Sequence, residues 1–180
     1  MAISVIIPTF NEAASITSVV TDIFAQAHQQ VAEVLVVDGG STDDTVTCAR
    51  QAGATVLTSP RPGRAAQMNY GALHATGDVF YFVHADVRLH PDFVADISGA
   101  LQAGFKAGRY RFRFDSDKLL LRVNNYGTRF GGLMSRGGDQ TLFITRHLFS
   151  QLQGFDEQYV IMEDFDIIRR IMSKSSMITY

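Results

Sequence analysis

Residues 80–90 read FYFVHADVRLH. The apolar run Phe80–Val83 is short and continuous, which is the pattern of a β-strand buried on both faces of a sheet. The run leads directly into His84 and Asp86, and further basic residues follow. This stretch predicts a core strand that brings polar side chains to one edge of a sheet. There they either mark the place where the strand surfaces or supply a metal ligand.

Strand and helix patterns alternate on the N-terminal side of this stretch and continue beyond it. Short apolar runs predict strands, and amphipathic runs bounded by capping residues, Pro or Gly predict helices. This alternation is typical of an α/β fold with a mostly parallel, Rossmann-like central sheet and helices on both faces. The predicted strands span residues 3–7, 34–37, 55–57 and 79–83, and the predicted helices span 12–27, 43–52, 63–75 and 91–103.

The chain changes character after about residue 105. Residues 109–114 alternate basic and aromatic side chains, which predicts a strand with one side facing solvent or an anionic ligand. A glycine-rich loop is expected over 131–138, and we find no repeat or linker. We therefore expect one domain over residues 1–180 with a smaller, mixed C-terminal part. Its remaining predicted elements are a strand over 140–145 and helices over 117–130, 146–153 and 163–172.

Composition restricts the class of function. The 180 residues, 46% of them hydrophobic, are enough for one buried core, and a net charge of −2 gives no general attraction to nucleic acid. The single cysteine, Cys48, favours a reducing compartment. No stretch approaches the roughly 20 apolar residues of a membrane-spanning helix, and no secretory signal is present. We expect a cytoplasmic protein, with peripheral contact at the inner face of the membrane left open.

Polar residues follow four successive predicted strands, in the segments 9–12, 38–43, 61–64 and 84–86. Each has a local explanation, such as helix capping by Glu12 or a turn closed by Asp38. Ligands of open parallel sheets, however, bind outside the carboxyl ends of the strands. Together the four segments favour a nucleotide pocket. In it Asp38 would accept from a base N–H, Glu12 or its neighbours would bind ribose, and Arg64 at a helix start would face a diphosphate.

The sequence contains neither GxxxxGK[ST] nor GxGxxG, so it lacks the phosphate-binding motifs of a P-loop protein and of a standard dinucleotide-binding fold. A divalent metal that bridges phosphate oxygens is the remaining common device, and it needs one or two protein carboxylates. Asp86 is placed to supply one. His84 could be a second ligand, although a single histidine at a strand end is more often a hydrogen-bonded structural residue.

A cluster of acids opens the last predicted helix. Glu163, Asp164 and Asp166 lie within four residues. Acids at a helix start complement the helix dipole, so capping is the simple explanation. Three of them are more than capping needs, which makes one of them a candidate general base for an incoming hydroxyl.

Taken in order, these segments resemble family 2 glycosyltransferases of the GT-A fold. The run RPGRAAQMN at 61–69 and the triplet His84-Ala-Asp86 are also similar to a bacterial subgroup of small members. The matching pieces cover nearly the whole chain and are IIPTFNE at 6–12, VVDGGSTDDT at 36–45, glycine-containing matches over 63–78, VHAD at 83–86, GFDE at 154–157 and EDFD at 163–166.

The resemblance implies a nucleotide-diphospho-sugar donor, usually a UDP-sugar, bound with Mg²⁺ or Mn²⁺ by residues 1–105, and an acceptor and catalytic part over 106–180. Asp86 would contact metal and diphosphate, Asp164 would be the catalytic base with Glu163 as the alternative, and transfer would invert the anomeric centre. The acceptor, whether saccharide, lipid or small molecule, is not implied, and oligomeric state stays open, a homodimer included. The implied substrate-binding residues are Pro8, Thr9, Glu12, Asp38, Arg64, Asn69 and Asp86.

Two departures from the family pattern matter. His84 replaces the first acid of the family's DxD motif, which bears on metal affinity, and the chain ends soon after the acidic helix, so the acceptor site could be incomplete. Two alternatives follow. One is a nucleotide-sugar-binding module without turnover. The other is a sugar-phosphate nucleotidyltransferase, which would need a glycine-rich basic loop where this chain has Thr9–Glu12.

Overall fold

The computed structural model describes residues 1–27, 30–110, 141–159 and 161–180. Its strands form a seven-stranded sheet in the order β3-β2-β1-β4-β6-β5-β7. The first four strands along the chain are parallel, β6 is antiparallel to β4 and β5, and β7 is parallel to β5. The strands are β1 Ile3–Thr9, β2 Val31–Asp38, β3 Thr55–Thr58, β4 Val79–Phe82, β5 Ala107–Arg109, β6 Leu142–Thr145 and β7 Met177–Thr179.

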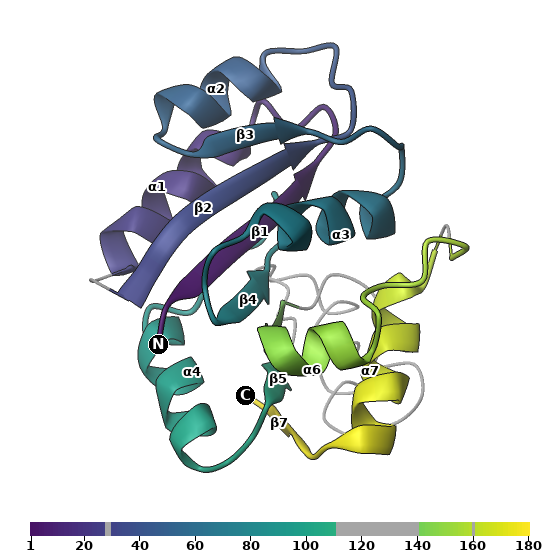
Figure 1. The fold of residues 1–180 in the computed structure, drawn as a ribbon. Helices are drawn as coiled ribbons and strands as arrows, with labels where there is room; N and C mark the ends of the chain where they lie inside the picture. The colour runs from purple at the N-terminus through teal and green to yellow at the C-terminus, as the bar shows by residue number, and fades with distance from the viewer. Residues whose placement is uncertain (28–29, 111–140, 160) are drawn as a thin grey trace, which may run out of the picture.

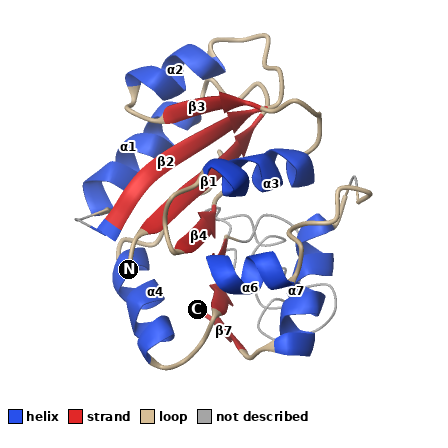
Figure 2. Cartoon of the chain, viewed as in Figure 1, coloured by secondary structure: helices blue, strands red, loops and turns tan. Residues whose placement is uncertain are grey.

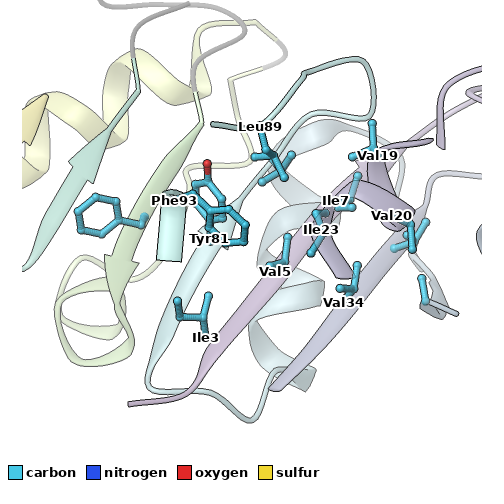
Figure 3. Close-up of a cluster of buried hydrophobic side chains, with 14 of the residues drawn as sticks. Ile3, Val5, Ile7, Val19, Val20, Ile23, Val34, Tyr81, Leu89 and Phe93 are labelled. Atoms are coloured by element: carbon cyan, nitrogen blue, oxygen red, sulfur yellow. The ribbon is translucent and has the colours of Figure 1, made fainter. Parts of the chain in front are cut away.

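Helices cover both faces of this sheet (Figures 1 and 2). Side chains alternate between the faces along β1, so Ile3, Val5 and Ile7 belong to one core cluster and Ile6 to the other. The first cluster packs against α1 and α4 (Figure 3), and the second packs against α3, α6 and α7. The helices are α1 Ile16–Gln26, α2 Thr45–Gln51, α3 Arg64–His74, α4 Phe93–Gln102, α6 Arg146–Gln151 and α7 Glu163–Lys174.

The α/β prediction is therefore confirmed, and the strand over 79–83 is a buried strand as its apolar run indicates. One element was missed: β7 pairs with β5 at the edge of the sheet, and its three half-buried residues carry no periodic pattern. The predicted strand over 109–114 begins earlier, at Ala107, and its residues 111–114 lie outside the described residues, as do the predicted helix over 117–130 and the glycine-rich loop. Among the described residues, no helix is both long enough and apolar enough to cross a membrane.

Close packing of α3 on the sheet brings one helix end to the carboxyl edge. A Cβ atom at Gly71 would lie 2.5 Å from the Cγ2 atom of Ile6 and 2.9 Å from that of Val37, so the glycine lets the helix approach β1 and β2. As a result the first residue of α3, Arg64, lies beside Glu163, the first residue of α7.

Candidate active site

The carboxyl ends of β1 and β2 place Thr9 and Asp38 side by side in the register of the sheet. Asp38 is only 4% exposed, and its Oδ2 atom accepts hydrogen bonds from the backbone N–H groups of Gly40 (2.9 Å) and Ser41 (3.1 Å). The local explanation for this aspartate, a turn closed by its own carboxylate, is thus part of the structure. The carboxylate is held rigidly at the strand end, where a ligand of a parallel sheet binds.

The loops after β1 and β2 are joined to each other by reciprocal hydrogen bonds. Asn11, in a left-handed conformation with φ of 56°, accepts at Oδ1 from the Thr42 N–H (2.8 Å) and donates its own N–H to the Ser41 hydroxyl (2.8 Å). The Glu12 N–H donates to the buried hydroxyl of Thr45 (2.7 Å). The Glu12 carboxylate accepts from the Ser15 hydroxyl (3.0 Å), at the start of α1. These bonds make one platform of the two loops.

Asp43 completes this platform. Its carboxylate accepts from the N–H of Ala13 (3.2 Å) and from the N–H and hydroxyl of Thr45. The hydrogen bond from the Thr45 hydroxyl is the main cause that lowers the pKa of Asp43 below its ordinary value, although desolvation opposes it. The sequence pattern did not predict these cross-links, because the partners are about thirty residues apart.

Gln67 is another residue that sequence analysis missed. Its Nε2 atom donates to the backbone carbonyls of Thr9 (2.8 Å) and Val37 (2.7 Å). Gln67 thus links α3 to the ends of both β1 and β2. Its amide also lies about 3 Å from where a Cβ atom of Gly39 would stand. A glutamine inside an amphipathic helix gives no sequence signal for such a role.

The acids that open α7 divide into two groups. Asp166 pairs with Arg170 one turn later, at 2.6 Å. Glu163 and Asp164 are instead buried, 3% and 8% exposed, and face residues of the first half of the chain. Met162, which precedes them, has φ of 72°, a left-handed conformation that is uncommon for a residue with a side chain. Of the three candidate bases, the structure thus brings two to the sheet edge.

Each of these two acids faces a basic residue from the other half of the chain. The Glu163 Oε1 atom lies 3.4 Å from Arg64 Nη1, whose side chain is 44% exposed. Asp164 Oδ2 lies 3.8 Å from Nε2 of His84, which is two residues beyond the end of β4. Four residues from segments far apart in the sequence therefore meet outside the carboxyl end of the sheet.

The residues that could hold a divalent metal lie just beyond the carboxyl end of β4. His84 lies two residues beyond the end of β4 at Phe82, and Asp86, which is exposed, lies two residues further on. No group of three or more His, Cys, Asp or Glu side chains in the described part of the chain is arranged to hold a metal by itself. One exposed carboxylate with few protein neighbours of its kind suits a hard cation that takes its other ligands from phosphate and water.

Two predicted residues are fully engaged within the protein. Pro8 lies inside β1 and is buried. Asn69 donates from Nδ2 to the carbonyl of Phe155 (2.9 Å) and to Oε1 of Glu157 (2.9 Å), and its Oδ1 accepts from the Phe155 N–H (2.9 Å). Asn69 thus binds a loop of the second half of the chain.

Acidic and basic side chains thus meet at the carboxyl edge of a mostly parallel α/β sheet, which is where such sheets bind their ligands. Residues 4–161 match the family model described as "Glycosyl transferase family 2". The chain belongs to this family.

Similar proteins agree with that assignment. An uncharacterized glycosyltransferase of Mycobacterium tuberculosis (strain CDC 1551 / Oshkosh) is 36% identical, over 93% of this chain and 68% of the relative. Glucosyl-3-phosphoglycerate synthase of the same strain is 35% identical over 57% of this chain, and the match covers only 34% of that enzyme. The crystal structure of this synthase from M. tuberculosis in complex with Mn²⁺, uridine-diphosphate and phosphoglyceric acid gives a TM-score of 0.76 at 25% identity, over 99% of this chain and 67% of that one.

Proposed function

We propose that this chain transfers a sugar from a nucleotide-diphospho-sugar, a UDP-sugar, to an acceptor hydroxyl, with inversion and with a divalent metal. The observation that carries the proposal is the meeting of Arg64 with Glu163 and of His84 with Asp164 outside the carboxyl edge of the sheet. Family membership supports it, and so does the similarity to a synthase that was crystallised with Mn²⁺ and uridine-diphosphate.

Residues of the first half would bind the donor. Asp38, rigid at the end of β2, is suited to accept from the imide N–H of uracil, and Thr9 and Glu12 lie on the adjoining platform. Pro8 would shape the wall of the nucleoside pocket through its backbone, because it is buried in β1. Arg64, half exposed at the start of α3, would contact the diphosphate together with the first N–H groups of that helix.

A bound Mg²⁺ or Mn²⁺ would neutralise charge on the leaving diphosphate. Asp86 would be its protein carboxylate, and His84 is the second candidate ligand. Either ion accepts carboxylate and phosphate oxygens, so Asp86 fits both. Because His84 also lies beside Asp164, it would connect the metal-binding and base positions.

Asp164 would act as the general base. It would take the proton of the acceptor hydroxyl while the acceptor oxygen forms a bond to the anomeric carbon. The bond from that carbon to the phosphate oxygen breaks, and its electron pair leaves with the nucleoside diphosphate. Arg64 would stabilise the charge that develops on this leaving group. Glu163 is the alternative base, although its nearest partner is the guanidinium of Arg64.

The proposed acceptor is a hydroxyl group of a saccharide, a lipid or a small molecule. A cytoplasmic location, peripheral contact with the inner face of the membrane, and a homodimer belong to the same proposal.

A thermal-shift titration with UDP, GDP, CDP and TDP, each with and without Mn²⁺, tests the donor site. A ligand at 100 times its Kd stabilises a folded protein by about 2.7 kcal/mol, which raises its melting temperature. We expect a shift with UDP that requires Mn²⁺, followed by UDP release when UDP-sugars and acceptors are supplied. No shift with any nucleotide would overturn the proposed donor site. A shift without UDP release from any donor would favour a binding module without turnover.

A further inference from the structure

We propose that Asn69 and Glu157 are a positioning pair that holds Arg64 in place beside Glu163. The pair would thereby align α3, which borders the proposed donor site, with α7, which carries the proposed base. This inference rests on the proposed function. Both residues belong to hydrogen bonds that join α3 to the turn formed by residues 152–157.

The turn 152–157 has an unusual backbone. Gln153 and Gly154 both have positive φ, 61° and 73°. Phe155 then inserts into the core, where its ring lies 5.0 Å from that of Phe82, centroid to centroid. From α7, Arg170 Nη1 donates to the carbonyls of Leu152 (2.7 Å) and Gly154 (2.9 Å). One side of the turn is therefore hydrogen-bonded to α7.

Asn69 fastens the other side of the same turn to α3. Its amide bonds both the N–H and the carbonyl of Phe155 and donates to the Glu157 carboxylate. The contact is close, because a Cβ atom at Gly154 would lie 2.6 Å from Asn69 Oδ1. Glu157 also pairs with Arg61 at 2.6 Å, just before α3 begins. The Arg61 side chain is 68% exposed, so this ion pair by itself contributes little.

The two helices joined through this turn carry the charged pair of the site. Arg64 is the first residue of α3, and Glu163 is the first residue of α7. Their contact is long, 3.4 Å, and the Glu163 Oε1 atom accepts no hydrogen bond within the described residues. A buried carboxylate depends strongly on the position of its partner charge. A shift of α3 relative to α7 would therefore alter the alignment of Arg64 with Glu163 directly.

Asn69→Asp tests this role, because it replaces the Nδ2 donor with an oxygen that faces the Glu157 carboxylate. A misplacement of about 1 Å costs on the order of 100-fold in rate, so we expect a comparable fall in kcat. The Kd of UDP with Mn²⁺ should rise by no more than about tenfold, because only the Arg64 contact with the diphosphate is disturbed and the platform is untouched. The double variant Asn69→Asp/Glu157→Gln places a donor opposite the new carboxylate and should regain about tenfold of the lost kcat.

Asp22→Asn on α1 is the matched control for Glu157→Gln, which also loses one negative charge, and its kcat should stay at the wild-type value. Hydrogen exchange provides a readout that does not depend on turnover. Asn69→Asp should speed exchange in residues 64–70 and 163–169 while residues 16–26 of α1 remain unchanged. If Asn69→Asp does not fold, Glu157→Gln carries the same test, with a smaller fall in kcat and the same pattern of exchange.

Unchanged kcat together with unchanged exchange at both helix starts would overturn the inference while leaving the proposed function intact. An equal loss of kcat and of UDP affinity, with no recovery in the double variant, would also overturn it, because that is the result of general destabilisation. If the wild-type chain releases no UDP from any donor, the proposed function fails. The exchange data then decide whether Asn69 and Glu157 couple the two helices.

Discussion

The two halves of this molecule are held together by different kinds of contact. In residues 1–105, the strands are parallel and the polar loops at their ends bond to one another, as Asn11 does with Thr42 and Glu12 with Thr45. In the described part of residues 106–180, the strands are three or four residues long and β6 is antiparallel to its neighbours. This second half depends on side chains that reach back to the first.

Arg146 is an example of such a contact. It lies at the start of α6, and its guanidinium donates to the carbonyls of Ala75 (2.6 Å) and Gly77 (2.7 and 2.9 Å) while lying over the ring of Phe80. Asn69 and the Arg64–Glu163 pair make further links across the same boundary. The comparison teaches that the proposed donor platform is built within the first half, whereas the position of the acid pair is a product of both halves.

The strongest test of this comparison is Asp164→Asn. If Asp164 is the base, the variant should lose on the order of 1000-fold in kcat, since general bases contribute about 100- to 10,000-fold. The affinity for UDP with Mn²⁺ should stay within about twofold, because the platform lies in the other half. UDP-release kinetics and calorimetric titration measure the two effects. Asp166→Asn, one turn further on and paired with Arg170, is the control, and full turnover in Asp164→Asn would pass the role to Glu163.

The packing of the first half can be tested with two helical glycines. Gly71→Ala forces a methyl group against Ile6 and Val37 and should destabilise the protein by about 1–3 kcal/mol. Gly99→Ala on α4 meets open space and should stabilise it by about 0.5–1 kcal/mol. Urea denaturation gives both values. Equal stability of the two variants would show that α3 can move away from the sheet without cost.

Asp38→Ala tests whether the platform binds the nucleoside. Hydrogen bonds to charged groups contribute about 1.5–3 kcal/mol, so we expect UDP to bind at least about tenfold more weakly. The substitution also releases the N–H groups of Gly40 and Ser41. Asp38→Asn keeps an oxygen for those groups, so its affinity for UDP should lie between that of the wild type and that of Asp38→Ala. Titration with UDP and with uridine measures the loss, and unchanged affinity in both variants would exclude Asp38 from the donor site.

The smallest expected effect is on stability and concerns the amino-terminal ends of β1 and β2. There Glu33 accepts hydrogen bonds from the hydroxyl of Ser4 (2.6 Å) and the N–H of Thr76 (2.6 Å). Burial raises the pKa of Glu33, but hydrogen bonds from Ser4 and Thr76 outweigh it, so the pKa lies below its ordinary value of 4.5. The folded state therefore binds this proton less readily than the unfolded chain.

The Glu33 contribution should be complete above about pH 4.5 and be lost as the pH falls through the lowered pKa. Glu33→Gln should lower stability near neutral pH and flatten its dependence on pH in the acid range. Urea midpoints at neutral and acid pH measure this, with Asp22→Asn as the charge control. If Glu33→Gln shows the same dependence of stability on acid pH as the wild type, Glu33 does not contribute to that dependence.

The strands of the first half could be predicted because each is a buried apolar run, and parallel strands bring their carboxyl ends to one edge. The edge strand β7 could not, because three half-buried residues have no distinctive periodicity. The ordered motifs also predicted that Asp38, Arg64, His84 and Asp164 belong to one site. That they contact a substrate in the roles assigned to them remains a prediction.

The sequence by itself determined the alternation of strands and helices, the family, and which polar residues follow which strand, because these properties depend on residues close together in the chain. Only the tertiary structure decided that Arg64 faces Glu163, that His84 faces Asp164, and that Asp166 pairs with Arg170. It also decided that Asn69 bonds the turn before α7. These pairings depend on how α3 and α7 pack on one face of the sheet, and packing is a property of the whole core, which no local pattern records.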